Sequence, residues 1–144
     1  MKRILTALVA ALALLAAVPA LAADRPVKLT LDGRPVDSAG GVAVLHGGVV
    51  YADVVPLVKS FNGLLTFQGD AVVVTINGVT GRFTPGSRTA LINDGAVTMP
   101  GQTFKRDGDL YVPLEIFVTR VAKARVKFDS SKTHADIAVN ASPA

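Results

Sequence analysis

An eight-residue stretch at positions 107–114, DGDLYVPL, constrains this chain more than any other. Asp107 and Gly108 form a turn pair, because glycine adopts positive φ without a steric penalty. Strand-forming residues follow. Pro113 then ends the strand, because it has no N–H to donate to a ladder, and it suits the first position of a helix. The stretch therefore predicts a turn, a short strand and a helix in direct succession.

An amphipathic helix is expected directly after Pro113. Apolar residues recur at i, i+3, i+4 and i+7, which places them in one stripe of a helix: Leu114, Phe117, Val118 and Val121. Glu115 near the start of this helix and Arg120 near its end match the helix dipole. Residues 125–128, RVKF, then alternate polar and apolar, which predicts a half-buried strand.

A fainter copy of this unit begins 60 residues earlier. The helix stripe recurs there at the same spacing, as Val54, Leu57, Val58 and Phe61. Asp53 stands where Pro113 stands, and it can start a helix as a cap or as a first-turn anion. The strand after the helix matches only after a slip of one residue. One turn–strand–helix–strand–strand unit therefore occurs twice, in half-repeats at about 27–76 and 79–139.

Turn signals divide the remainder of the chain into short strands. Pairs such as Asp32-Gly33 and Asn77-Gly78 recur at intervals of roughly 8–12 residues, which is typical of antiparallel β-structure. Two helices among such strands predict an α+β fold and not a βαβ series. We expect mostly antiparallel, twisted sheets packed on two short amphipathic helices.

The N-terminus has the pattern of a secretory signal peptide at residues 1–22. A charged start, Met1-Lys2-Arg3, precedes an apolar run over 4–18 and a small-x-small ending at Ala22. Pro19 and the shortness of the run disfavour the alternative, an uncleaved membrane anchor. We expect one domain at 23–144, exported to the periplasm or outside the cell, with no transmembrane anchor after cleavage.

Composition excludes some classes of function. The chain has no Cys, so it forms neither a disulfide nor a thiolate metal site. Lys2 and Arg3 belong to the predicted signal peptide, so 13 of the 15 basic residues stand against 11 acidic ones, a net charge of +2. That charge is too small to indicate nucleic-acid binding.

Four segments carry a resemblance to a known family and stand in the family's order: PGS at 85–87, ALINDG at 90–95, LYVPL at 110–114 and VKFD at 126–129. They resemble the copper amine oxidase N-terminal-like domain, also called the stalk domain, over about 79–139 and more weakly over 27–76. The family usually has Gly-Ala after the helix, where this chain has Ala122-Lys123-Ala124. It often has Trp at the end of the next strand, where this chain has Phe128.

The resemblance implies an antiparallel sheet wrapped on a helix, in exported bacterial proteins. It also implies that the copper and the tyrosine-derived cofactor of the oxidases belong to a separate catalytic domain. This chain resembles only the accessory domain, so we expect no amine oxidation, no cofactor and no enzyme activity.

The residues offer no constellation for catalysis or metal binding. A copper site built on imidazoles needs about three His, and only His46 and His134 are present. We expect both to be solvated or at an edge, although the two could join a carboxylate in a weak surface site. No Ser has a nucleophile-elbow pattern, and most carboxylates lie in turns. We therefore expect no catalytic and no metal-ligating residues.

The candidate binding residues are basic or aromatic. The densest basic run comprises Arg120, Lys123, Arg125 and Lys127, followed by Lys132. It is either a solvated helix end and strand face, or a patch for an acidic envelope polymer or an anionic lipid headgroup. Tyr51 and Tyr111 occupy equivalent positions in the two copies. Their rings are either buried or form a stacking platform for sugar.

These observations favour a non-catalytic exported module of the bacterial cell envelope, which binds or assembles with an envelope polysaccharide or protein. The alternative is a small envelope hydrolase acting on glycan or peptide, which predicts perturbed acids clustered in one pocket. Self-association through an open sheet edge is a third hypothesis, since strand edges pair readily.

Overall fold

The computed structural model describes residues 24–36 and 42–139 and confirms the predicted α+β class. The predicted signal peptide at 1–22 lies outside the described residues. The helical segments are α2 (Val54–Ser60), α3 (Leu114–Ile116) and the π-helix η2 (Phe117–Val121), which continues α3. Across these two described ranges, no helix is long and apolar enough to span a membrane.

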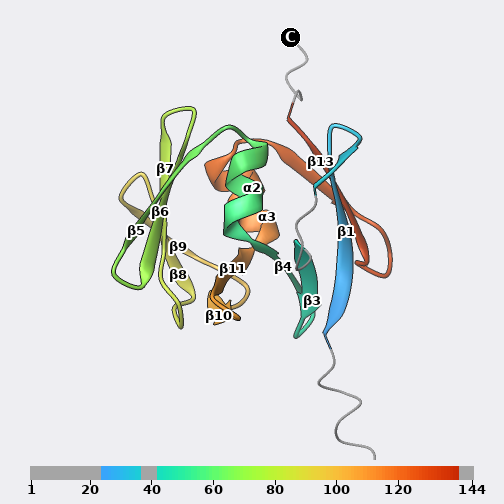
Figure 1. The fold of residues 1–144 in the computed structure, drawn as a ribbon, viewed down its shortest axis with the longest axis horizontal. Helices are drawn as coiled ribbons and strands as arrows, with labels where there is room; N and C mark the ends of the chain where they lie inside the picture. Colours follow the sequence, from blue (N-terminus) through green and yellow to red (C-terminus); the bar gives the residue numbers. More distant parts are fainter. Residues whose placement is uncertain (1–23, 37–41, 140–144) are drawn as a thin grey trace, which may run out of the picture.

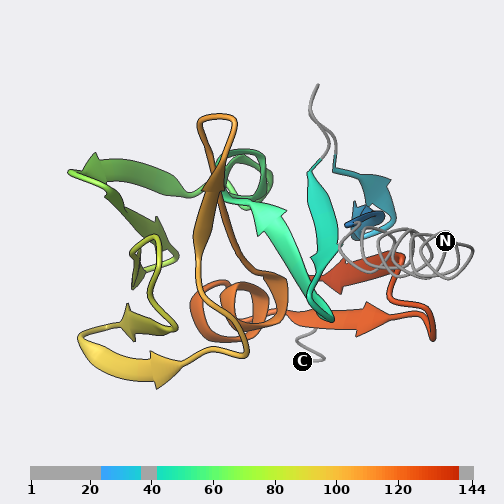
Figure 2. The same cartoon turned by 90° about the horizontal axis from the view of Figure 1, so that it is seen from below.

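Two sheets enclose the helices (Figure 1). The larger runs β10–β11–β4–β3–β1–β13–β12, with β2 beside β1. Its strands are β1 (Arg25–Leu31), β2 (Arg34–Pro35), β3 (Ala43–His46), β4 (Val49–Asp53), β10 (Phe104–Arg106), β11 (Asp109–Pro113), β12 (Arg125–Phe128) and β13 (His134–Ala138). The smaller sheet comprises, in order, β5 (Leu64–Gln68), β6 (Ala71–Ile76), β7 (Val79–Phe83), β8 (Thr89–Ile92) and β9 (Gly95–Thr98). Figure 2 shows both helices end-on between the sheets.

Both predicted helix stripes lie in the core. Every stripe residue of the second copy is fully buried: Leu114, Phe117, Val118 and Val121. In α2, Val54, Leu57 and Val58 are at most 2% exposed. Phe61, the fourth predicted residue of this stripe, is the C-cap of α2 and is only partly buried against the core. The centroid of the Phe117 ring lies 6.0 Å from that of Phe83 and 6.3 Å from that of Phe61. The stripes therefore hold the two sheets together through one hydrophobic core.

Strands β4 and β11 join the two copies about a local twofold axis. They pair antiparallel, with Ala52 opposite Val112. These are equivalent residues of the two copies, so the axis passes between them. The neighbouring pairs obey the same relation, since Tyr111 lies opposite Asp53 and Pro113 opposite Tyr51.

The two copies exchange strands. Strand β1 belongs to the first half of the sequence, but it pairs with β13, the last strand of the second half. Strands β7, β8 and β9 belong to the second half, but they extend the sheet begun by β5 and β6. The exchange is not symmetric, because β1 pairs parallel to β13 whereas β7 pairs antiparallel to β6.

The second helix carries one residue more than the first, in a π-helical turn. In the first copy, the amide of Gly63 donates to the carbonyl of Val58 at 3.0 Å. In the second, the amide of Ala124 donates to the equivalent carbonyl, of Val118, at 2.9 Å. The bond spans five residues in the first copy and six in the second. A π turn accommodates such an insertion, which accounts for the one-residue slip in the sequence pattern.

The two helix starts differ from each other and, in part, from expectation. Asp53 is the N-cap of α2, and its carboxylate accepts from the amide of Val55 at 3.2 Å, which confirms the predicted cap. The prediction that Pro113 occupies the first helical position was wrong by one residue. Its ψ of 122° is extended, so it closes β11 and stands at the N-cap without a side-chain hydrogen bond.

Candidate functional site

The hairpins β3–β4 and β10–β11 gather four aromatic rings on neighbouring strands of the larger sheet, from its edge strand β10 to β3. Phe104 stacks on Tyr111 with centroids 5.3 Å apart, and it lies 4.8 Å from both Tyr51 and His46. Tyr51 is 3% exposed and Tyr111 is 5% exposed, and burial raises the pKa of both phenols. The two tyrosines therefore present no open ring face to a sugar, and they do not contribute to a surface patch.

Asp24 connects the two copies beside these rings. It lies 2.8 Å from Nδ1 of His46, and it accepts from Nη2 of Arg106 at 2.5 Å. His46 and Arg106 are equivalent residues of the two copies, so the carboxylate sits close to the local axis. Burial works to raise the pKa of Asp24, but the hydrogen bonds and charges of His46 and Arg106 lower it overall. The arrangement fixes the start of β1 on the two hairpins.

A buried acid lies at the start of α2. Asp53 is 5% exposed, and burial raises the pKa of its carboxyl. The amide of Val55 works against that shift, whereas the neighbouring carboxylate of Asp109 adds to it. Among the described acids, Asp53 is the one whose pKa is raised, as a general acid of a hydrolase would need, but its carboxylate already serves as a helix cap.

A cavity of about 600 Å³ lies along the outer side of β12 and β13 and the turn after β1. Its lining comprises Asp32, Gly33, Arg125, Val126, Lys127, Asp136, Ile137 and Ala138. We call it the β12 cavity. Arg125 and Lys127 lie two residues apart on β12, so both side chains project from its outer face, and both are exposed. Lys127 lies opposite Asp136.

Two of the four cations predicted to form a basic patch, Arg125 and Lys127, line the β12 cavity. Arg120 and Lys123 are exposed at the end of η2, but they do not line the β12 cavity. None of the four predicted cations forms an ion pair with a described residue. On the acidic side of the cavity, hydrogen bonds from Thr30 and His134 lower the pKa of Asp136, and the charge of Lys127 adds to that effect.

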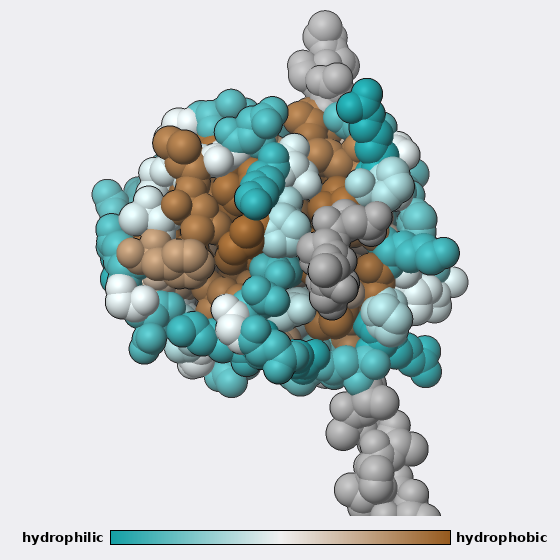
Figure 3. Space-filling model, in the orientation of Figure 1, coloured by the Kyte–Doolittle hydropathy of each residue, from teal (hydrophilic) through white to brown (hydrophobic). Residues whose placement is uncertain are grey.

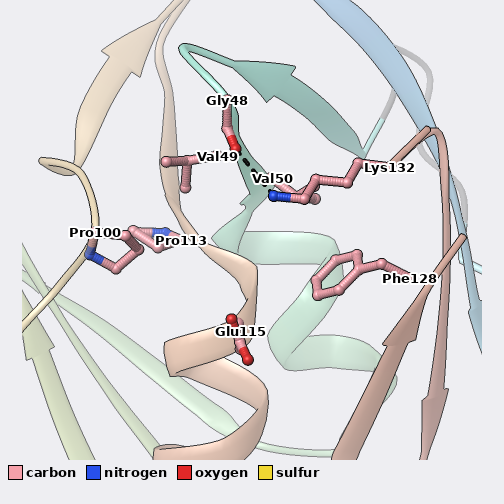
Figure 4. Close-up of a pocket in the computed structure, with 8 residues that line it drawn as sticks. All are labelled: Gly48, Val49, Val50, Pro100, Pro113, Glu115, Phe128 and Lys132. Atoms are coloured by element: carbon pink, nitrogen blue, oxygen red, sulfur yellow. Dashed lines mark hydrogen bonds between the residues drawn. The ribbon is translucent and has the colours of Figure 1, made fainter. Parts of the chain in front are cut away.

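A smaller groove of about 200 Å³ lies on the twofold-related hairpins and was not predicted (Figure 4). Its lining comprises Gly48, Val49, Val50, Pro100, Pro113, Glu115, Phe128 and Lys132. The Phe128 ring and the Glu115 carboxylate point into the space, and the Lys132 ammonium donates to the carbonyl of Gly48 at 3.4 Å. Four segments far apart in sequence form it, at 48–50, 100, 113–115 and 128–132, so no local pattern indicates it.

The two histidines lie apart, each beside a carboxylate. His46 contacts Asp24, and Nε2 of His134 lies 2.8 Å from Asp136. Within residues 24–36 and 42–139, no three His, Asp or Glu side chains gather in a geometry suited to a metal ion.

Comparison with known proteins identifies the family. A search of curated proteins finds no match. A model of the copper amine oxidase N-terminal domain matches residues 30–137, which cover nearly all of both copies of the repeat. That family is one of non-catalytic domains. Both the match and the antiparallel sheets on two short helices agree with the resemblance carried by the LYVPL segment, and the chain therefore belongs to the copper amine oxidase N-terminal domain family.

Proposed function

We propose that this protein is a non-catalytic binding module exported to the bacterial cell envelope, where it binds an acidic polymer. The observation that carries the proposal is the pair of exposed cations, Arg125 and Lys127, on the wall of the β12 cavity. Neither is neutralised by an ion pair within the described part of the chain. Residues 1–22, with their charged start and apolar run, support export.

The chemistry of the cavity favours an extended anionic ligand. Arg125 presents a planar fork of donors suited to carboxylate or phosphate, and Lys127 adds a second positive charge two residues along the same strand. Arg120 and Lys123 lie in the chain just before β12, exposed at the end of η2. A polymer that carries regularly spaced acids can contact all four cations, whereas a small anion contacts one or two. Such binding weakens as salt rises, because exposed charges are screened.

Binding to polygalacturonate, a polymer of uronic acid, tests this proposal. The protein is expressed from its full sequence and purified in the form that the cell produces. It is then titrated with polygalacturonate and with neutral dextran. We expect binding to the acidic polymer alone, and loss of binding at about 0.5 M salt, where screening extends only a few ångströms.

A matched pair of double variants locates the site. Arg125→Ala with Lys127→Ala should weaken binding about tenfold, which corresponds to roughly 1.4 kcal/mol. Lys59→Ala with Lys105→Ala removes the same formal charge from exposed positions that do not line the cavity. An equal loss in both double variants would show that net charge alone drives binding and that the β12 cavity is not the site.

A hydrolase is the second candidate, favoured only by the raised pKa of Asp53 beside Asp109. Purified protein is incubated with chromogenic glycosides and peptides, alongside the Asp53→Asn variant. We expect no turnover above buffer from either protein. Turnover by the wild type that Asp53→Asn abolishes, while the variant stays folded by circular dichroism, would replace the binding module with an enzyme.

A further inference from the structure

Strand β5 is an exposed edge of the smaller sheet with apolar side chains on both faces. It pairs with β6, and its other side has no neighbour among the described strands. Leu64 is 72% exposed and Phe67 is 57% exposed, and these are the two most exposed large hydrophobic residues of the described chain. Figure 3 shows hydrophobic residues gathered on the side of the molecule where β5, β6 and β7 lie.

The other sheet edges differ from β5 in composition. β12 carries Arg125 and Lys127, and β10 carries Lys105 and Arg106. Charged side chains of this kind hinder strand addition, because pairing would bring like charges together. Strand β9 exposes no large apolar side chain. β5, with the sequence LLTFQ, has neither a charge nor a proline and is open to a further strand.

The pattern of β5 is complementary to itself. In an antiparallel pair centred on Thr66, Leu65 of one copy lies opposite Phe67 of the other, and this contact occurs twice. Within one copy, Leu65 lies opposite Val74 and Phe67 lies opposite Val72, so both share the face whose β6 residues are buried. The second copy would continue that apolar face across the edge. Aromatic–aliphatic cross-strand pairs stabilise antiparallel sheets.

From this pattern we propose that two copies of the chain associate through β5, antiparallel about Thr66, to form one continuous ten-stranded sheet from their two five-stranded sheets. The contact is isologous, because each copy contributes the same strand. It is independent of the proposed ligand. It places two β12 cavities in one assembly, so a polymer that reaches both would bind more tightly through effective concentration.

The size of the contact predicts a weak dimer. A fully buried aromatic side chain covers about 150–250 Å², and each copy offers one half-exposed phenylalanine and one exposed leucine on a five-residue strand. The total lies well below the roughly 1,200 Å² of a stable interface. We therefore expect a dissociation constant between about 10 μM and 1 mM, and a monomer at lower concentration.

Sedimentation equilibrium on the processed protein, from about 5 μM to 1 mM, tests the association. We expect a monomer–dimer equilibrium in the wild type. Thr66→Lys places two ammonium groups opposite each other at the centre of the contact and should shift the midpoint at least about tenfold upward in concentration. Thr98→Lys makes the same change on β9, at the other edge of the same sheet, and should leave the equilibrium unchanged. Circular dichroism checks that both variants fold.

Cysteine cross-linking tests the register, since the chain has no Cys of its own. Directly opposite residues of an antiparallel pair have Cα atoms about 4.5–5.5 Å apart, within the range of a disulfide. Thr66→Cys should therefore form a disulfide-linked dimer on mild oxidation, and Thr98→Cys should not. A monomer at every concentration would overturn the proposal. So would cross-linking by Thr98→Cys alone, or only between the two variants when mixed, since these indicate a β9 contact or a head-to-tail contact.

Discussion

The two helices each bury an apolar stripe between the sheets, but they differ in how they begin and in the type of helical turn. Helix α2 begins at a carboxylate cap, Asp53, and runs as a regular α-helix. The equivalent helix begins at Leu114, after an N-cap residue, Pro113, that makes no side-chain hydrogen bond, and it becomes a π-helix after Ile116. Despite these differences, both bury their apolar stripe, with Phe61 at the end of the first stripe only partly buried. Burial of the stripe therefore determines where each helix lies, whereas the cap and the type of turn are free to vary.

The second helix accommodates one residue more than the first. The π turn at Phe117–Val121 absorbs it before the chain reaches β12. The strand after each helix consequently starts from an equivalent backbone position, with Asn62 at a φ of 56° in one copy and Lys123 at 54° in the other. The insertion changes the helix but not the sheet, because the sheet register is fixed by many cross-strand contacts.

Truncating the core stripe should have the largest effect, and it should be similar in the two copies if burial is what matters. Leu114→Ala and Leu57→Ala each remove a fully buried side chain, and we expect each to lower the free energy of unfolding by roughly 2–5 kcal/mol. Urea denaturation monitored by circular dichroism measures both. A loss below about 1 kcal/mol in one copy alone would show that its helix is not part of the common core.

Removing the cap should have a smaller effect, confined to the first copy. Asp53→Ala leaves the amide of Val55 without its acceptor, and we expect a loss of about 1 kcal/mol in the free energy of unfolding. Asp53→Asn keeps an acceptor at the same place and serves as the control, measured by the same denaturation. If both variants lose the same stability, the hydrogen bond at the cap is not the cause.

The pH dependence of stability distinguishes the capping hydrogen bond of Asp53 from the effect of its negative charge. The pKa of Asp53 is raised above its ordinary value of 3.8 in the folded protein. The stabilisation that comes from this raised pKa is therefore fully present below pH 3.8, and it is lost as the pH rises through the pKa of Asp53 in the folded protein. Asn at this position does not titrate, so the stability of Asp53→Asn relative to the wild type should increase with pH. A difference that stays constant between pH 3 and 8, measured by thermal unfolding, would contradict this.

The smallest effect is expected where the helices end. Lys123 adopts a φ of 54°, a conformation that costs a non-glycine residue roughly 1 kcal/mol. Lys123→Gly should relieve that strain and raise the free energy of unfolding by a few tenths of a kcal/mol to about 1 kcal/mol, less the entropy glycine gains in the unfolded state. Asn62→Gly should gain less, because asparagine tolerates this conformation. Differential scanning calorimetry measures the stability of both variants. An equal or larger gain from Asn62→Gly would show that backbone strain at Lys123 is not the cause.

Local signals were sufficient for most elements of the fold. The Asn77-Gly78 and Asp107-Gly108 pairs take positive φ at both residues and form the predicted turns. The apolar stripes fixed the faces of both helices, because burial follows a period that the sequence displays. Strand β10 was missed, since Phe104-Lys105-Arg106 has no clear alternation and forms a strand only by pairing with β11.

Long-range arrangement was less predictable. Nothing local in β1 indicates that it pairs parallel to β13, so the exchange of strands between the copies could not be derived from either half. The same limit applies to the site. The alternation of Arg125 and Lys127 predicted their exposure, but the burial of Tyr51 and Tyr111 depends on Phe104, which pairing between strands brings beside them.

The parallel contact between β1 and β13 has a consequence for how the molecule matures. Leu29 of β1 lies opposite Ala135 of β13. The first described strand can therefore pair with this neighbour only after the last described strand has been synthesised. A nascent chain that emerges N-terminus first keeps one side of β1 open until β13 has been made, and contacts so distant in sequence form slowly. A polypeptide with this topology therefore completes its larger sheet only after β13 has been made and has paired with β1.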